Sequence, residues 1–271
     1  MMTVQELTPE QLLIDAGTLS EALSDEASEC DQQNRINFSA FERVRKLRLG
    51  ALRVPQIFGG AGGSIPQLVT LMMSVAAGDS SVAQALLPHF VFVERTRLMA
   101  TETQQENFLK QVATGDLVGG ASAESGGRFR GEVSTRLTRQ GQLYRLSGEK
   151  IYSTGALMGQ ILKVVALNDD DQSVLVVIPA DRHGITRHDD WRGMGQRGTM
   201  SGRTELNNVL VEEQEIFQVH HWQNERHHTG AASQILHCAI QAGIARAALR
   251  EAANWARNHL RAVKESGDSR G

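Results

Sequence analysis

The segment LYRLSGEKIYSTG, residues 143–155, decides how this chain folds, because it marks a β domain between two helical regions. Residues 143–151 have the character of a strand, which Gly148 interrupts. Short runs of the same kind lie on both sides of it and are separated by turn residues: 133–137, 164–167, 174–178 and 204–211. Short strands at such intervals predict a compact antiparallel β domain, which we place at residues 117–217.

The residues before this β domain have helical periodicity. A first helix carries its apolar residues at three-residue steps, at Phe38, Phe41, Val44 and Leu47. Three further helices follow a glycine-rich stretch, over about residues 65–76, 80–87 and 102–113. Asp79 or Ser80 can cap the second of these three, and Gly115 can end the last in a left-handed conformation. Residues 1–116 are therefore predicted to form an all-α N-terminal domain.

From about Asn224 the chain becomes helical again, in a long stretch without proline. The apolar residues of this stretch occupy more than one face, so the helix needs neighbours on several sides. We interpret residues 218–271 as the start of a C-terminal helical bundle that is incomplete, which makes the fold class α+β. Either a second copy of the chain or helices absent from this sequence would supply the neighbours. We expect a homo-oligomer, a dimer or a tetramer.

The composition narrows the class of protein. The chain has 271 residues, of which 41% are hydrophobic and 22% are charged, with a formal net charge of −3. Lysine and arginine are spread along the chain, which argues against a nucleic-acid partner. Cys30 and Cys238 lie far apart, so no disulfide is expected. Met1–Glu10 is too polar for a signal peptide, and no apolar run approaches the roughly 20 residues of a membrane span. We therefore expect a cytoplasmic protein without a membrane partner.

Four local motifs occur in a recognisable order. They are AGDSSVA at residues 77–83 with His89 behind it, GEKIYSTG at 148–155, GQRGT at 195–199 with TEL at 204–206, and Glu225-Arg226 at the start of an Ala/Gly-rich helix. With the order of helices, small β domain and long helix, these motifs resemble the acyl-CoA dehydrogenase superfamily over residues 35–260. The resemblance implies a flavoprotein oxidoreductase.

Two further segments are similar to one branch of that superfamily. Asp189-Asp190-Trp191 and Thr199-Met200-Ser201-Gly202 resemble segments of the flavin-dependent monooxygenases of organosulfur metabolism, such as dibenzothiophene monooxygenase and the sulfur-acquisition oxidoreductases. This similarity implies reduced FMN from a separate flavin reductase, O2 as the oxidant and a small organosulfur substrate. Dehydrogenases of the superfamily usually carry Thr-Glu-Pro in a flavin loop where this chain has SAES at 122–125. An FAD-dependent acyl-CoA dehydrogenase is the alternative.

Five residues are candidates for binding the flavin, whose polar edge a protein must hydrogen-bond. The aromatic ring of Tyr152 can lie against the flavin, and the hydroxyl of Thr154 projects from the same strand face. Ser122 belongs to a loop of small residues that a ligand can approach closely. Ser201 can bond a phosphate or ribityl oxygen, and Trp191 can wall the ring or the substrate cavity. Ordinary core packing is the other interpretation of Tyr152 and Trp191.

His89 is the candidate catalytic residue. The resemblance places a histidine here beside the flavin, where it can donate a hydrogen bond or move a proton. The alternative is a core histidine that is bonded to a backbone carbonyl.

Two other sequence features give weaker evidence of a functional site. Glycines 59–63 lack the Lys and Ser/Thr of a P-loop. The histidine pairs 220–221 and 227–228 have no cysteine or Glu-x-x-His spacing beside them, so we predict no metal site.

The end of the sequence bears on the activity that the resemblance implies. In the superfamily, the C-terminal helices supply a further active-site group, much of the tetramer interface and part of the flavin site. None of these helices follows Gly271. We therefore expect a truncated chain with at most partial flavin affinity, and a catalytically inactive homologue is a further alternative.

Overall fold

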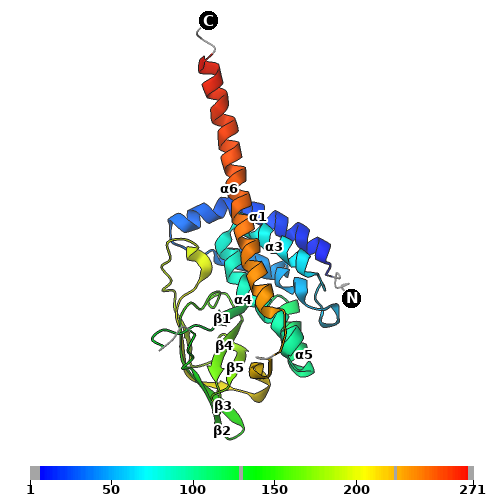
Figure 1. Cartoon of the computed structure of the whole chain (residues 1–271), viewed down its shortest axis with the longest axis vertical. Coiled ribbons are helices and arrows are strands. Elements are labelled where there is room, and N and C mark those ends of the chain that lie inside the picture. Colours follow the sequence, from blue (N-terminus) through cyan, green and yellow to red (C-terminus); the bar gives the residue numbers. More distant parts are fainter. Residues whose placement is uncertain (1–6, 128–130, 223–224, 268–271) are drawn as a thin grey trace.

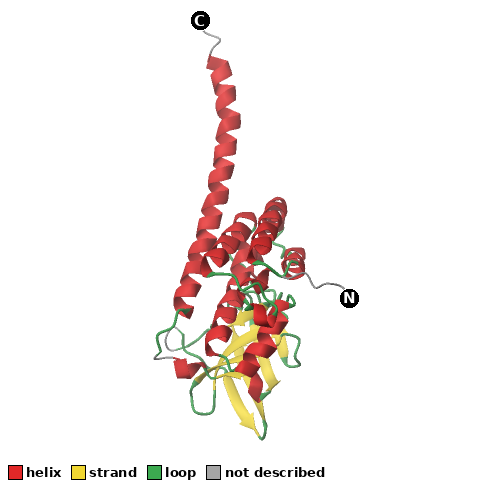
Figure 2. Ribbon diagram, turned by 90° about the vertical axis from the view of Figure 1, so that its right-hand side faces the viewer, coloured by secondary structure: helices red, strands yellow, loops and turns green. Residues whose placement is uncertain are grey.

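The computed structural model describes residues 7–127, 131–222 and 225–267, so residues 1–6 of the polar N-terminal segment lie outside the described residues. The N-terminal part consists of five α-helices: α1 (Pro9–Gln32), α2 (Phe38–Lys46), α3 (Ile65–Gly78), α4 (Ser80–Met99) and α5 (Glu102–Ala113). Two 3-10 turns, η1 (Leu49–Arg53) and η2 (Gln56–Phe58), connect α2 to α3. In Figure 2 most of these helices lie above the strands.

Polar side chains cap the first turns of α3 and α4, and the cap of α4 is the one that the sequence predicts. The Asp79 carboxylate accepts hydrogen bonds from the backbone N–H groups of Ser81, at 2.8 Å, and Val82, at 3.2 Å, and so caps α4. Ser64 forms a capping box with Gln67 at the start of α3. The prediction that a left-handed glycine follows α5 is confirmed, since Gly115 has a φ of +112°.

Two features of the helical part differ from the prediction. No helix is predicted before residue 38, yet α1 forms there and buries Leu12, Ala16, Leu19 and Leu23 on one face. The helix that was expected to end near Pro88 continues to Met99. Proline removes one helical hydrogen bond. The residues that follow it, Phe90–Val93, are all buried, and their burial outweighs that loss.

The middle part is one twisted sheet of eight strands: β1 (Val118–Ala121), β2 (Arg136–Gln140), β3 (Leu143–Lys150), β4 (Ile161–Leu167), β5 (Ser173–Pro179), β6 (Ile185–Arg187), β7 (Thr204–Val211) and β8 (Ile216–Phe217). The strand order is β6-β7-β3-β2-β4-β5-β8, and β1 pairs with β4. Most pairings are antiparallel, as predicted, but β1 and β2 each run parallel to β4. The sheet is therefore mixed. At Gly148 the register between β3 and β7 shifts, which explains the interruption seen in the sequence.

The last element, α6 (Thr229–Gly267), packs on α3 and α4 through its first half. Its buried residues there are Ala232, Leu236, Ala239 and Ile240. Gly243 lets the helices approach closely, because a Cβ at that position would lie 2.5 Å from the backbone oxygen of Met73. The second half projects away from the body of the molecule, as Figure 1 shows, and leaves Leu249 and Trp255 exposed. The predicted start of this helix near Asn224 lies outside the described residues.

The prediction of an α+β fold, with helices, a β domain and then a long helix, is confirmed. Among the residues that the structure describes, none of the helices has the length and apolarity that crossing a membrane requires.

Candidate active site

A surface cleft of about 190 Å3 brings together Tyr152 and Trp191, which are 39 positions apart in the sequence. Tyr152 and Trp191 line it from opposite segments, with ring centroids 6.0 Å apart in an edge-to-face arrangement. The indole N–H of Trp191 donates to the backbone oxygen of Gln196 at 3.1 Å, which fixes the orientation of the ring. Tyr152 has a left-handed φ of +50° and stays 59% exposed. An exposed aromatic ring on a strained backbone is typical of a binding site rather than of a packed core.

Three hydroxyl groups form a short chain beside these rings. Ser201 Oγ lies 2.8 Å from Thr154 Oγ1 and 2.8 Å from Thr199 Oγ1. Backbone bonds hold the two segments together, since the Ser153 N–H donates to Gly202 O and the Gly155 N–H donates to Thr199 O, each at 3.0 Å. The hydroxyl of Ser153 is buried and has no hydrogen-bond partner among the described residues. The cleft therefore offers several donors and acceptors to a polar ligand.

The loop that contains Ser122 runs along the same segment. The Gly120 N–H donates to Thr154 O at 3.0 Å, and the Ile151 N–H donates to Ala123 O at 2.9 Å. Ser122 is exposed and lies between these two bonds. Of the five predicted flavin-binding residues, Tyr152, Trp191 and Ser201 line the cleft, whereas Thr154 contacts Ser201 and Ser122 lies in the neighbouring loop.

A buried ion pair that the sequence analysis missed anchors this loop. The Lys150 ammonium donates to Glu124, and the two side chains are 0% and 5% exposed. Burial opposes ionisation of Glu124, but hydrogen bonds from Lys150, Ser134 and Thr135 outweigh it and lower the pKa of Glu124 to about 2. The signal for this pair was present in the sequence, because GEKIYSTG at 148–155 contains Lys150 and SAES at 122–125 contains Glu124. Only the fold shows that they meet.

Models of two consecutive acyl-CoA dehydrogenase domains match this chain. The N-terminal domain model covers residues 16–116 and the middle domain model covers residues 120–209, together more than half of the chain. The chain belongs to the acyl-CoA dehydrogenase superfamily. The family resemblance that the motifs predicted is confirmed.

Individual members of the superfamily are similar over most of this chain. Dibenzothiophene monooxygenase of Rhodococcus qingshengii is 30% identical over 234 residues, which cover 81% of this chain and 56% of that protein. The probable FMNH2-dependent monooxygenase SfnC of Pseudomonas putida is 27% identical over 210 residues, covering 77% of this chain and 52% of that protein. The chain spans about half the length of these curated relatives.

Among solved structures, FMN-bound TdsC from Paenibacillus sp. A11-2 has the same fold, with a TM-score of 0.86 at 24% sequence identity. The match covers 92% of this chain and 65% of that one. The acyl-CoA dehydrogenase fold is therefore present from the N-terminal helices through the start of α6.

The candidate catalytic histidine of this acyl-CoA dehydrogenase fold is not among the residues that line the cleft. His89 is fully buried on α4, where its Nε2–H donates to Gly50 O at 3.0 Å and its Nδ1 accepts from the Val118 N–H at 3.2 Å. Burial lowers the pKa of His89 to about 4, although the bond to Gly50 opposes the shift. This is the geometry of a core histidine. A catalytic role for His89 stays a prediction, and it requires one backbone bond to be exchanged for a ligand.

The four histidines near the start of α6 have separate partners. The rings of His220 and His221 contact each other, with centroids 4.2 Å apart. His228 Nε2 lies 3.3 Å from the carboxylate of Glu94, and His227 Nδ1 lies 2.9 Å from the hydroxyl of Thr229. Within the described part of the chain, no three metal-ligating side chains converge.

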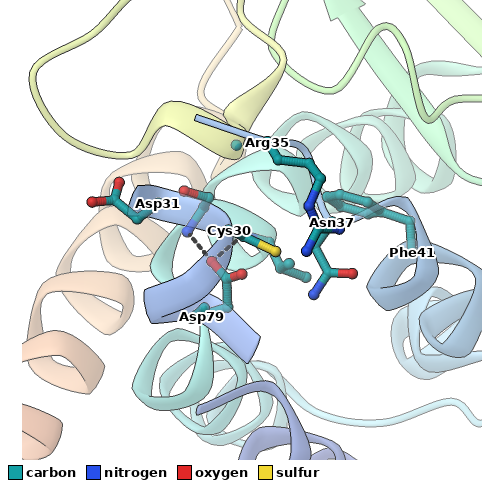
Figure 3. Close-up of a pocket in the computed structure, with 10 residues that line it drawn as sticks. Cys30, Asp31, Arg35, Asn37, Phe41 and Asp79 are labelled. Atoms are coloured by element: carbon teal, nitrogen blue, oxygen red, sulfur yellow. Dashed lines mark hydrogen bonds between the residues drawn. The ribbon is translucent and has the colours of Figure 1, made fainter. Parts of the chain in front are cut away.

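A water-sized hollow of about 20 Å3 lies where the cleft segment meets the helical part. Figure 3 shows Cys30 and the capping carboxylate of Asp79 around it. Burial raises the pKa of Asp79. Next to this hollow, Arg197 donates to Asp31 O at 3.2 Å. This contact ties the turn before Ser201 to α1 and so positions one wall of the cleft.

Proposed function

We propose that this chain binds FMN in the cleft between Tyr152 and Ser201 and is the flavin-binding part of a reduced-FMN monooxygenase. The observation that carries this proposal is the meeting of two aromatic rings with the hydroxyls of Thr154 and Ser201, on a fold whose relatives include dibenzothiophene monooxygenase. The same relatives support a small organosulfur substrate and a separate flavin reductase as partners.

The residues present suit a flavin. Tyr152 and Trp191 offer apolar faces to an aromatic ring system, and Thr154 and Ser201 offer hydrogen bonds to its polar edge. The unpartnered hydroxyl of Ser153 is a further donor that a ligand would satisfy. When bound, reduced FMN supplies the two electrons with which one oxygen atom of O2 passes to the substrate while the other leaves as water. The protein's part is to orient the ring and exclude water.

Other members of the superfamily hold FAD, and an FAD-dependent acyl-CoA dehydrogenase is the second candidate. The segment SAES at 122–125, without threonine or proline, favours the monooxygenase. We also propose that the chain acts as a homo-oligomer, because the second half of α6 exposes Leu249 and Trp255. A cytoplasmic location stays a prediction.

A fluorescence titration of the chain with FMN and with FAD tests the proposal. We expect FMN to bind more tightly than FAD, and we expect Thr154→Val and Ser201→Ala each to weaken FMN binding. Thr138→Val is the matched control, since Thr138 is exposed on β2. Binding of FAD alone would support the dehydrogenase. Binding of neither flavin would refute the proposal and favour a catalytically inactive homologue.

A further inference from the structure

A second cavity of about 240 Å3 lies between the end of α4, the sheet and the turn that precedes α6. Its walls combine polar and apolar side chains: Met99, Val165, Leu175, Val219 and Trp222 are apolar, and Ser173, His227 and Thr229 are polar. The guanidinium group of Arg95 also lines it. Cavities that hold drug-sized ligands are about 300–1,000 Å3, so this one suits a smaller molecule.

Arg95 has no hydrogen bond or ion pair that the described residues provide. The carboxylate beside it in the sequence, Glu94, is already engaged by Arg53, at 2.6 and 3.0 Å, and by Arg97, at 3.2 Å. Burial lowers the pKa of Arg95, which means that its charged form is poorly solvated. A largely buried guanidinium without an anion is unfavourable unless a ligand completes the site.

A second buried cation lies close to the first. Lys163 on β4 is only 6% exposed and has no hydrogen-bond acceptor among the described residues. Burial and the positive charge of Arg95 lower the pKa of Lys163 to about 7. Lys163 stands two residues before Val165 on the same strand, so both side chains point to the face of the sheet that lines the cavity. Arg95 lines the cavity, and Lys163, which is not among the lining residues, adds a second positive charge close to Arg95, so this side of the cavity attracts an anion.

The cavity and the cleft share no lining residue, but Lys163 is close in the sheet to the segment that lines the cleft. Lys163 pairs with Gly120 on β1, and the Gly120 N–H donates to the carbonyl of Thr154. Neighbouring strands lie about 4.8 Å apart and successive residues rise about 3.3 Å. The wall at Val165 is therefore on the order of 10 Å from the backbone of Thr154, which is within the span of a small substrate and the ring beside it.

We propose that this cavity binds the acid group of the substrate, so that the enzyme acts on a small organic oxyanion with a short apolar body. Arg95 and Lys163 hold the sulfinate, sulfonate or carboxylate group, and the apolar walls hold the rest of the molecule. The substrate assignment rests on the proposed function, whereas anion binding by the cavity does not require flavin.

Calorimetric titration without flavin tests the site, with benzenesulfinate as the anionic probe and methyl phenyl sulfone as its neutral counterpart. We expect the sulfinate to bind more tightly than the sulfone. Arg95→Met should weaken sulfinate binding about tenfold to a hundredfold and leave sulfone binding unchanged, because only a charged hydrogen bond is lost. Lys163→Met should weaken it less, and more at pH 6 than at pH 8. Arg257→Met, on the exposed face of α6, is the matched control.

Two results would overturn the proposal: equal sulfinate affinity in the wild type and Arg95→Met, or a preference of the wild type for the neutral sulfone. Thermal unfolding of each variant shows whether the variant is folded. Arg95→Met should be at least as stable as the wild type because it removes an unpaired buried charge. The FMN titration separates the two proposals. Sulfinate binding without FMN binding would sustain the anion site and refute the flavin site, and the reverse result would do the opposite.

Discussion

Lys150→Met would remove the ammonium that anchors the Ser122 loop. The pair it forms with Glu124 is buried, and loss of one partner from such a pair costs about 3–5 kcal/mol. The pKa of Glu124 gives an upper limit for this cost. Its fall from 4.5 to about 2 corresponds to about 3 kcal/mol, at about 1.4 kcal/mol for each pKa unit, and bonds from Ser134 and Thr135 contribute to it beside the bond from Lys150. We expect Lys150→Met to lower the free energy of unfolding by about 3 kcal/mol at pH 7.

The sign of the pH dependence follows from the lowered pKa of Glu124. Its contribution is present above pH 4.5 and is lost as the pH falls through about 2. At pH 3 about 1.4 kcal/mol of it remains by the same arithmetic. The difference between the wild type and Lys150→Met should therefore shrink to less than half between pH 7 and pH 3.

Urea unfolding followed by circular dichroism at both pH values measures this difference. Lys110→Met is the matched control, because Lys110 pairs with Glu106 on the exposed face of α5, and its unfolding midpoint should equal that of the wild type. The reasoning is refuted if Lys150→Met costs less than about 1 kcal/mol at pH 7, or if its effect is as large at pH 3. We also expect this variant to bind FMN more weakly, since the loop that presents Ser122 loses its anchor.

Two further predictions concern the core. The pKa of His89 is lowered to about 4, so stability should fall by about 3 kcal/mol as the pH drops from 6.5 to 4, because the unfolded chain is protonated first. Urea unfolding across this range should show that the wild type loses about 3 kcal/mol more than His89→Gln. Leu236→Ala should cost about 2–5 kcal/mol because Leu236 is fully buried where α6 packs on the N-terminal helices. An unchanged melting temperature for Leu236→Ala would contradict this packing.

Local signals in the sequence predicted those parts of the fold that neighbouring residues control. Asp79 caps a helix by accepting bonds from Ser81 and Val82, and Gly115 ends one through its own backbone freedom. The strand at 143–150 also follows from its own pattern. By contrast, α1 was missed although Thr8 and Pro9 mark its start, because its apolar residues are interspersed with acidic ones. The continuation of α4 beyond Pro88 was missed because it depends on burial.

The sequence by itself determined the family and the order of helices and sheet, and it singled out Tyr152, Trp191 and Ser201, which line the cleft. Each of these depends on short motifs, which can be recognised from their residue types and spacing without knowing which residues they contact in the fold. Only the tertiary structure decided which charges are paired. Lys150 meets Glu124, whereas Arg95 and Lys163 come close together with no anion among the described residues. Such pairing depends on contacts between residues tens of positions apart, and the energy of a charge depends on the burial that those contacts produce.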